Sequence, residues 1–410
     1  MRVNLLIVIA LFLATGQAVY GQDGDIAGVH DPCLIKDGDT FYLFCTGGTM
    51  PMRKSTDLQT WERLGTALAS LPTWAAETIP GTKGAWAPDI AYFDGEFHLY
   101  YSLSTFGSNH SCIGLATNRT LDPSSDKYEW KDQGVVVRSR RSDNFNAIDA
   151  NVVIDDSGQP WLSFGSFWSG IKLVRLNRQT GKTDGPMTHI AGRNGGAIEA
   201  PFIVRRRGLF YLFVSFDSCC KGVNSTYKTM VGRSRRVTGP YVGIDGRKMT
   251  DGGGSLVLSS HGRVKGPGHN AVITEDGIDY LVHHFYDASN NGKATLQIRP
   301  MLWSARGWPV VGEPGVLTKL KKTASTAGRF QHSVNYGKSA PISLLPSGNI
   351  NTPTNAATWT QNGPVLRLRW PRRDAPGGAW TDECFVSPDG KWYVGRNQQG
   401  GIIRGVRAVE

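Results

Sequence analysis

The feature that most constrains the fold is a segment that occurs five times between residues 30 and 282. Each copy has an ionisable lead residue, a short apolar run, a turn with a glycine, and a second run rich in aromatic residues. The lead residues are Asp31, Asp89, Asp149, Glu199 and His269, and the glycines are Gly38, Gly95, Gly158, Gly208 and Gly277. Apolar runs of about four to eight residues around a Gly- or Asp-containing turn predict β-hairpins.

The spacing of the copies indicates the architecture. Successive lead residues are 50 to 70 positions apart. Repeats of this length that contain several strands are typical of propeller blades. The chain between copies has further strand-forming runs, such as IGLATN at 113–118, and almost no amphipathic helical stretch. We therefore predict an all-β protein with a five-bladed β-propeller, whose lead residues converge on a central channel.

The propeller pattern ends near Gly307, and the basic, polar segment LKKTASTAG follows it at 320–328. The short apolar runs beyond this segment predict a small antiparallel β-barrel or β-sandwich. We thus expect a signal peptide at 1–21, a propeller domain at 22–318 and a C-terminal β domain at 319–410. The last domain would be either a carbohydrate-binding accessory module or a stabilising cap.

The N-terminal residues have one Arg, an apolar run from Leu5 to Ala14, and the small residues Val19 and Gly21. This pattern predicts a secretory signal peptide with cleavage after Gly21, and hence a secreted or periplasmic protein. The alternative is an uncleaved anchor, although the run is short for a membrane span. We expect no stable membrane insertion after cleavage.

The formal net charge of +11 raises the question of a nucleic-acid partner. The basic clusters lie in predicted turns and lack the interleaved aromatic residues of nucleic-acid modules, so we expect no nucleic-acid binding. The charge is better explained as a solvated surface, or as a weak attraction to acidic polysaccharide. We expect a monomer.

Six cysteines in an exported chain permit disulfides, and their spacing does not fit a zinc site. Cys33 and Cys45 lie on the two arms of the first hairpin, where a cross-strand bridge is geometrically plausible. Cys219 and Cys220 are adjacent in the chain, and Cys112 and Cys384 have no evident partner.

Carboxylates that converge in an aromatic-lined pocket suit glycoside hydrolysis, in which one carboxylic acid protonates the leaving oxygen and a second carboxylate activates water or attacks carbon. Aromatic rings stack on sugars, and Trp86, Phe106, Phe167 and Trp168 come near the carboxylates when the copies are aligned. An additional carboxylate raises the pKa of the acid by like-charge repulsion.

A structural role is the alternative for each of these residues, because an Asp before a strand is usually a turn or cap residue. The common register of the copies favours a site for Asp31, Asp149 and Glu199. For Asp89, a residue that simply holds a loop is an equal alternative. His269 is either a hydrogen-bonded core histidine or a channel ligand for metal or water. His283 and His284 alternate along one strand, so one of them should lie at the surface or between blades.

Several motifs carry a specific resemblance. They are HDP at 30–32, WAPD at 86–89, NAID at 146–149, SFGSFWSG at 163–170, AIEAPF at 197–202 and GPGHN at 266–270. They resemble glycoside hydrolase family 43, and within it the endo-1,5-α-L-arabinanases, over about residues 25 to 311. The family fold is a five-bladed β-propeller, which agrees with the number of repeats.

The resemblance implies catalytic roles. Asp31 would be the general base, Glu199 the general acid, and Asp149 the residue that tunes the pKa and orientation of Glu199. The family inverts configuration, so the carboxyl groups of Asp31 and Glu199 should lie roughly 6.5–9.5 Å apart to admit a water molecule.

The expected substrate-binding residues combine the aromatic positions with those implied by the resemblance. They are Trp86, Asp89, Phe106, Gly107, Asn146, Ala147, Ile148, Ser166, Phe167, Trp168 and Arg299. The resemblance also implies a calcium ion held by His269 at the channel centre, with water completing its shell, although Ca²⁺ prefers oxygen ligands.

Two features depart from the family pattern. Ala150 stands where a proline usually follows the Asp, and Cys33 and Cys45 together replace residues that are not usually cysteine. The joint replacement favours a disulfide between these two cysteines. Neither departure removes a catalytic group.

The resulting hypothesis is an exported endo-arabinanase that cuts α-1,5 links in arabinan. An exo-acting α-L-arabinofuranosidase or β-xylosidase on the same scaffold is the first alternative. A non-catalytic sugar-binding propeller is the second alternative, and the intact set of three carboxylates argues against it.

Overall fold

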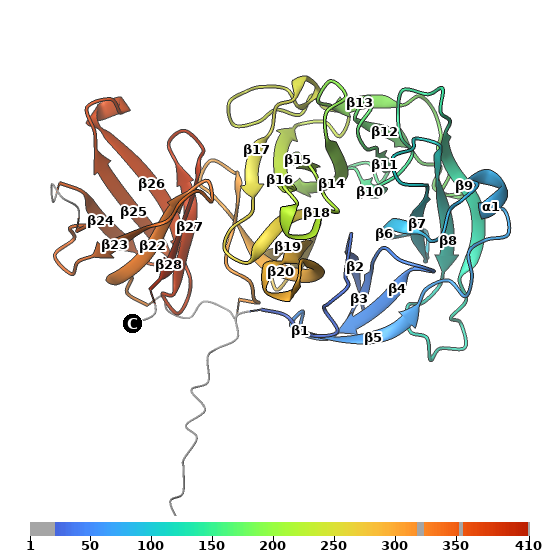
Figure 1. Ribbon diagram of the computed structural model, residues 1–410, viewed down its shortest axis with the longest axis horizontal. Helices are drawn as coiled ribbons and strands as arrows, with labels where there is room; N and C mark the ends of the chain where they lie inside the picture. Colours follow the sequence, from blue (N-terminus) through green and yellow to red (C-terminus); the bar gives the residue numbers. More distant parts are fainter. Residues whose placement is uncertain (1–20, 318–323, 352–355, 409–410) are drawn as a thin grey trace, which may run out of the picture.

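A computed structural model describes residues 21–317, 324–351 and 356–408 of the chain. Five sheets are arranged around a common centre, and a sixth sheet lies beside them (Figure 1). The prediction of a five-bladed β-propeller followed by a small β domain is confirmed. The predicted signal peptide, apart from Gly21, and the predicted boundary at 318/319 lie outside the described residues.

Each blade is one antiparallel sheet whose strands follow chain order, except for the short first strand, β1. Blade 1 contains β1 (Asp23–Gly24), β2 (Cys33–Asp37), β3 (Thr40–Phe44), β4 (Pro51–Ser55) and β5 (Thr60–Thr66). Blade 2 contains β6 (Trp86–Phe93), β7 (Glu96–Leu103), β8 (Ser111–Asn118) and β9 (Lys131–Ser139). Blade 3 contains β10 (Asn151–Ile154), β11 (Pro160–Phe164), β12 (Ile171–Arg175) and β13 (Thr188–Ala191).

Blade 4 contains β14 (Ile198–Arg206), β15 (Leu209–Phe216), β16 (Lys228–Ser234) and β17 (Ser255–Leu258). Blade 5 contains β18 (Val264–Glu275), β19 (Ile278–Asp287), β20 (Lys293–Trp303) and β21 (Pro309–Val311). The helical elements of the described residues are short: α1 (Ala75–Thr78), η1 (Gly222–Asn224), η2 (Met249–Asp251), η3 (Ala288–Asn290) and η4 (Pro376–Gly378). No helix in this part of the chain has the length and apolar character needed to cross a bilayer.

Apolar side chains fill the seam between every pair of neighbouring blades. The cluster around Phe44 and Leu99 joins blades 1 and 2, and the cluster around Phe164 joins blades 2 and 3. Comparable clusters join blades 3 and 4, blades 4 and 5, and blades 5 and 1. Because the second strand of a blade is buried on both faces, its sequence is almost continuously apolar and aromatic, as in LFYLFVSF of β15.

The N-terminal segment closes the ring between blades 1 and 5. β1 pairs in parallel with β5 of blade 1, while Ala27 bridges Thr295 of blade 5. The side-chain amide of Gln22 donates to the carbonyl of Ile298 at 3.1 Å and accepts from its N–H at 2.7 Å. Gln22 therefore pairs with blade 5 as a strand residue would, through its side chain.

The C-terminal domain is one seven-stranded antiparallel sheet in the order β23-β22-β28-β27-β26-β25-β24. Its strands are β22 (Gly328–Val334), β23 (Ala340–Leu344), β24 (Thr358–Asn362), β25 (Val365–Pro371), β26 (Ala379–Val386), β27 (Trp392–Asn397) and β28 (Ile402–Arg407). Bridges from Asn349 to Thr358 and from Leu344 to Ile350 connect its edges. The sheet thereby curls into a small barrel around its own apolar core.

The expected Cys33–Cys45 disulfide is wrong: both are free, buried thiols, and the structure instead joins Cys219 to Cys220. The strand register explains the failure. Cys33 lies opposite Phe44, so Cys45 is offset by one residue and points to the other face of the hairpin. Cys33 accordingly packs between blades 1 and 2, and Cys45 between blades 1 and 5.

A buried ionic group fixes the barrel to the propeller. Arg404 of β28 binds Glu313 with two hydrogen bonds, of 2.5 and 3.0 Å. Glu313 also lies 3.9 Å from Arg299 of β20, which donates to the carbonyl of Gly312 at 2.9 Å. The prediction that Arg299 binds substrate is therefore wrong. Its side chain is 1% exposed and serves the contact between the domains.

We predict that Glu313→Gln lowers the free energy of unfolding by about 3–5 kcal/mol, because it leaves the buried Arg299 and the partly buried Arg404 without a counter-charge. Burial raises the pKa of Glu313, but Arg404 and Arg299 outweigh it and lower the pKa to about 2. The contribution of Glu313 to stability is thus complete above about pH 4.5 and is lost as the pH falls towards 2. Denaturant unfolding between pH 2.5 and 7 measures both effects.

Glu383→Gln of the C-terminal barrel is the matched control, because Glu383 pairs with Arg367 at the surface. Its expected cost is below about 1 kcal/mol. Equal losses in the two variants, or an acid dependence that Glu313→Gln leaves unchanged, would contradict this account of the domain contact.

Candidate active site

The chain leaves regular strand geometry at an equivalent place in every blade, within the first strand of blades 2, 4 and 5 and just before it in blades 1 and 3. In blade 2, Trp86 pairs with Ser102 and Asp89 with Tyr100, so two residues of β6 face one residue of β7. Blades 4 and 5 have the same irregularity. One residue in each blade adopts left-handed backbone there: Asp31 (φ 50°), Ala87 (41°), Asp149 (61°), Ala200 (55°) and His269 (46°). We call these five the bulge residues, because two residues opposite one define a β-bulge.

Each bulge turns a main-chain N–H towards the neighbouring blade, where a side chain accepts it. Ala87 N–H donates to Thr46 at 2.7 Å and Asp149 N–H to Ser102 at 3.0 Å. His269 N–H donates to Ser215 at 2.8 Å. Each acceptor stands at the end of the second strand of the preceding blade. These bonds hold the bulge residues in an orientation that a non-glycine residue rarely adopts.

At the other two bulges the N–H has a different kind of acceptor. Between blades 5 and 1, Asp31 N–H donates to Nδ1 of His284 at 3.1 Å. Between blades 3 and 4, the acceptor position is Gly165, where a Cβ would lie 2.5 Å from a carbonyl oxygen. Because no side chain fits there, Ala200 N–H instead donates to the carboxylate of Asp149 at 3.1 Å. Asp149 is thereby fixed beside Glu199.

The five lead residues do not occupy equivalent positions relative to the bulges, contrary to the prediction. Asp31, Asp149 and His269 are bulge residues, whereas Glu199 precedes its bulge residue by one position and Asp89 follows its own by two. The expected place of Asp89 in the pocket wall is wrong. Its buried carboxylate accepts from Val152 N–H at 2.7 Å and holds blade 2 to blade 3, while burial raises its pKa to about 7.

A cleft of about 710 Å³ opens over the bulges of blades 1, 3, 4 and 5. Asp31, Asp149, Glu199 and His269 all line it. Of the predicted substrate-binding residues, those that also line it are Trp86, Phe106, Gly107, Asn146, Ile148, Ser166, Phe167 and Trp168. Ala147 does not, because it is fully buried in the seam between blades 2 and 3.

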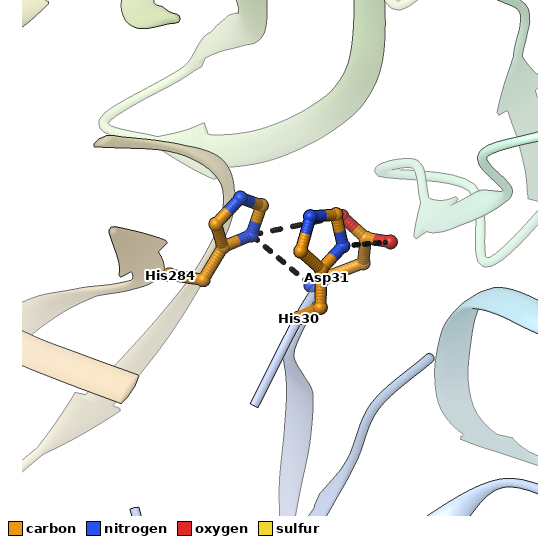
Figure 2. A group of neighbouring side chains, drawn as sticks. All are labelled: His30, Asp31 and His284. Atoms are coloured by element: carbon orange, nitrogen blue, oxygen red, sulfur yellow. Dashed lines mark hydrogen bonds and ion pairs between the residues drawn. The ribbon is translucent and has the colours of Figure 1, made fainter. Parts of the chain in front are cut away.

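Asp31 is held by donors on both carboxylate oxygens, of which Figure 2 draws His30. Its Oδ2 lies 2.8 Å from Nδ1 of His30 and accepts from the hydroxyl of Thr46 at 2.6 Å. Its Oδ1 lies 3.0 Å from Nδ1 of His269. His284 stands 3.6 Å from Oδ1 but already accepts the Asp31 N–H at Nδ1, so that nitrogen donates nothing to the carboxylate. A carboxylate offers about four acceptor sites, so one site remains, on Oδ1.

The surroundings of the three carboxyl groups give them different pKa values. Burial raises the pKa of Asp31, but the charges and hydrogen bonds of His30 and His269 outweigh it and hold this pKa well below its usual range. Burial raises the pKa of Asp149 to about 8, with repulsion from Glu199 and Asp31 adding to the rise. Burial also raises the pKa of Glu199, against hydrogen bonds from Ser166 and Tyr227. Near neutral pH Asp31 is ionised, while the Asp149–Glu199 pair retains a proton.

Glu199 is held at the cleft by the same elements that surround its bulge. Ser166 donates to Oε2 of Glu199 at 2.8 Å. The ring of Tyr227 lies beside Gly268 of the next blade, where a Cβ would come within 2.2 Å of it. Glycine at 268 thus lets Tyr227 reach Glu199.

The cleft wall also carries the aromatic surface expected for a sugar site. Phe106 is 85% exposed, which is unusual for an aromatic side chain without a binding role, and Phe167 and Trp168 of the neighbouring blade 3 also line the cleft. Phe167 and Trp168 both have positive φ, of 49° and 37°. The strained backbone and exposed rings together indicate a surface built for a ligand.

Several cleft residues were not predicted. They are His30, Ser104, Thr105, Ser108, Gly195, Ser218, Cys219, Cys220 and Lys221. The adjacent cysteines in DSCCK were a visible signal, since this stretch follows the second strand of blade 4. The acceptors Thr46, Ser102 and Ser215 had a weaker signal, namely a hydroxyl residue at the end of each aromatic run. His283 and His284 are both fully buried, so neither lies at the surface.

Possible ligand atoms on His269, on its neighbour Asn270 and on the cleft residue Asn146 bear on the predicted calcium ion. The hydrogen bonds of His269 use its Nδ1 and its main-chain N–H, so Nε2 remains for an ion. The side-chain amide of Asn270 and the amide oxygen of Asn146 are buried without a partner, and amide oxygens suit Ca²⁺. These residues therefore fit a hydrated cation. His30, Asp31 and His284 also lie close enough for a metal, but hydrogen bonds already occupy the nitrogens that face Asp31.

An ionised carboxylate, a proton-bearing carboxyl pair and exposed aromatic rings in one cleft define a site for glycoside hydrolysis. Comparison with known proteins agrees with this class. The family model "Glycosyl hydrolases family 43" matches residues 26–309.

Two curated relatives and one solved structure illustrate the similarity. The chain is 44% identical over 300 residues to an extracellular exo-α-(1→5)-L-arabinofuranosidase of Cellvibrio japonicus, covering 70% of this chain and 86% of that protein. It is 43% identical over 299 residues to an extracellular endo-α-(1→5)-L-arabinanase of Bacillus subtilis, covering 71% and 90%. The structure of a Cellvibrio cellulosa α-L-arabinanase complexed with arabinohexaose is 44% identical, with a TM-score of 0.68, and covers 70% of this chain and 96% of that one.

The chain therefore belongs to glycoside hydrolase family 43. It is a glycoside hydrolase whose catalytic propeller extends over blades 1 to 5.

The hydrogen bonds to the bulges generate a prediction for Ser102. Ser102→Ala leaves the buried N–H of Asp149 without an acceptor, so the free energy of unfolding should fall by about 1–3 kcal/mol. Because Asp149 is then free to shift, we also expect kcat to fall by roughly tenfold or more. Urea unfolding and steady-state kinetics measure the two effects.

Ser234→Ala is the matched control, because Ser234 is buried and accepts the N–H of Arg236 at 3.1 Å, away from the cleft. It should reduce stability and leave kcat unchanged. If Ser102→Ala kept full activity, the bond to the bulge would have no part in placing Asp149.

Proposed function

We propose that the protein hydrolyses α-1,5-linked L-arabinofuranosyl bonds within arabinan, with inversion at the anomeric carbon. The observation that carries this proposal is the convergence of Asp31, Asp149 and Glu199 in one aromatic-lined cleft, where their surroundings lower the pKa of Asp31 and raise those of Asp149 and Glu199. The substrate class is supported by the relatives, whose names specify α-1,5-arabinan bonds, and by the arabinohexaose complex of a similar enzyme.

In this mechanism Glu199 protonates the glycosidic oxygen, and Asp31 takes a proton from the attacking water. The one unused acceptor site of Asp31 is on Oδ1, so that atom receives the proton. Repulsion between the Asp149 and Glu199 carboxylates prevents both from ionising together, so the pair holds the proton that Glu199 transfers. The predicted distance of 6.5–9.5 Å between the carboxyl groups of Asp31 and Glu199 stays a prediction.

Internal cleavage is the favoured mode of action. The cleft volume of about 710 Å³ lies in the range that accommodates ligands larger than one sugar ring, and exposed Phe106 extends its apolar wall. Release of single arabinose units is the alternative, because one relative of similar identity is named as an exo-acting enzyme.

Calcium at the channel centre is the proposed cofactor. Nε2 of His269 would bind it, and water would complete its shell. The ion would supply positive charge beside the carboxylates. Without it, burial lowers the pKa of His269, but Asp31, Asp149 and Glu199 raise it to about 9, so a protonated ring supplies that charge.

Export is the proposed location. The apolar N-terminal run of the sequence and the word "extracellular" in the names of two relatives support it. The disulfide between Cys219 and Cys220 is consistent with an oxidising compartment. Arabinan of plant pectin would be the substrate met there.

Product analysis on linear arabinan tests the proposed function. We expect arabino-oligosaccharides of several lengths early in the reaction, because internal bonds are cut. Asp31→Asn and Glu199→Gln should each lower kcat by about 10²–10⁴-fold or more, since each removes one proton transfer. Chromatography of the products and initial rates give both measurements.

Arabinose as the sole early product would establish exo action instead. Full activity in either carboxylate variant would refute the assigned roles. An unmutated protein that binds arabino-oligosaccharides and never cleaves them would refute hydrolysis altogether.

Chelation tests the calcium proposal. Incubation with EDTA should lower both the midpoint of thermal unfolding and kcat, because the folded protein loses a bound ligand and a protonated His269 replaces the divalent ion with only a single charge. Added CaCl₂ should restore both, whereas MgCl₂ should not, since Mg²⁺ demands a tighter octahedral shell. An unfolding midpoint and activity that EDTA leaves unchanged would count against a bound ion.

A further inference from the structure

Behind Asp31 lies a chain of hydrogen bonds that the proposed mechanism does not use. Nδ1 of His30 contacts Oδ2 of Asp31 at 2.8 Å, and Nε2 of His30 lies 2.8 Å from the hydroxyl of Tyr286. The same hydroxyl accepts the main-chain N–H of Cys220 at 2.7 Å. Tyr286 belongs to β19 and is buried, whereas Cys220 lies in the loop that follows β15 and lines the cleft.

The direction of these bonds follows from the donors available. A tyrosine hydroxyl has one proton and accepts at two lone pairs. The ionised carboxylate of Asp31 can only accept, so the proton between it and His30 lies on Nδ1 of His30. In the neutral ring Nε2 is then an acceptor, and it takes the proton of the Tyr286 hydroxyl. The N–H of Cys220 fills one acceptor site of the same hydroxyl.

The ring of His30 is also fixed in its plane. It stacks on the ring of His284, with centroids 4.0 Å apart and an interplanar angle of 23°. His284 is fully buried and accepts Asp31 N–H at Nδ1, so its own position is determined by the bulge (Figure 2). His30 therefore approaches Asp31 with a defined plane, a defined tautomer and a defined donor.

We propose that His30 and Tyr286 are positioning residues for the general base. Tyr286 fixes the tautomer of His30, and Nδ1–H of His30 fixes the Asp31 carboxylate so that the free acceptor site on Oδ1 faces the attacking water. The loop that carries Cys220 anchors this chain from the cleft side. The proposal rests on the proposed function, because it assumes that Asp31 is the base.

Two other roles for His30 would give different kinetic results. His30 lines the cleft, so a direct contact with substrate would make its loss raise KM. A purely structural role would make every replacement of His30 equally harmful. A positioning role requires only a donor at the place of Nδ1, and an effect on kcat with little change in KM.

The test compares His30→Asn with His30→Gln on linear arabinan. The amide of asparagine can place an N–H near the position of Nδ1, whereas that of glutamine lies nearer the position of Nε2. We expect His30→Gln to lower kcat by about 10²-fold, since a displaced catalytic group loses about that much. We expect His30→Asn to retain activity within about tenfold of the unmutated protein, and KM to change by less than about threefold in both.

Tyr286→Phe provides a second variant that leaves His30 in place. It removes the proton that fixes the tautomer, so kcat should fall by roughly fivefold to thirtyfold, the factor that corresponds to the loss of one hydrogen bond. Tyr211→Phe is its control, because Tyr211 is equally buried and donates to the carbonyl of Gly307 at 2.6 Å, in the core between blades 4 and 5. Tyr211→Phe should leave kcat unchanged. If the His30 variants do not fold, as judged by thermal unfolding, this pair alone decides the question.

Three results would overturn the proposal: equal losses in folded His30→Asn and His30→Gln, a raised KM with unchanged kcat, or full kcat in Tyr286→Phe. Asp31→Asn separates this proposal from the function on which it depends. An active Asp31→Asn variant would refute the assigned base itself. An inactive Asp31→Asn variant beside a fully active His30→Gln variant would refute only the positioning role.

Discussion

The site depends on the hydrogen bonds that neighbouring blades make to the main chain of the bulges. Left-handed backbone at Asp31, Asp149 and His269 is unfavourable for residues with a side chain, by an amount of the order of 1–3 kcal/mol. Each bulge is kept because its N–H has an acceptor in the preceding blade, and leaving that N–H buried without a partner would cost about as much again. The apolar seams hold the blades close enough for these bonds to form. The placement of the functional side chains therefore depends on the strained backbone, which in turn depends on the packing between blades.

Small differences between equivalent positions separate the functions of the copies. Asp31 has histidines on both sides and stays ionised, whereas Asp149 and Glu199 share one buried region and retain a proton. The origin of this pairing is Gly165, which cannot carry the side chain that the other blades use as an acceptor. Asp149 takes over that task and is thereby fixed next to the acid. The missing side chain in one blade thus brings about the contact that the chemistry needs.

The fold and the three carboxylates could be predicted from sequence because both repeat. Hairpins at a regular spacing predicted the blades, and an ionisable residue in each copy predicted convergence. The predictions that failed for Asp89 and for the Cys33–Cys45 disulfide depend on the exact register of the strands. Asp89 lies two residues beyond its bulge and joins blades, and Cys45 is one residue out of step with Cys33. Arg299 is predicted to bind substrate, but it pairs with Glu313 at the contact between the propeller and the barrel. His30 and Tyr286 were missed because their relation to Asp31 exists only after blade 5 meets blade 1.

The bonds to the bulges all run in one direction around the ring, from one blade to the blade before it, and in four of the five the acceptor lies at the end of that blade's second strand. The functional module of this propeller is therefore offset from the visible blade: it consists of the end of one second strand and the start of the next first strand. Exchange of whole blades between related enzymes would cut every such module in half. Recombination points placed between the first and second strands, at turns such as that of Gly95, would keep each bulge with its acceptor. A propeller of this kind should thus be easier to recombine, by evolution or by design, at the middle of its blades than at their borders.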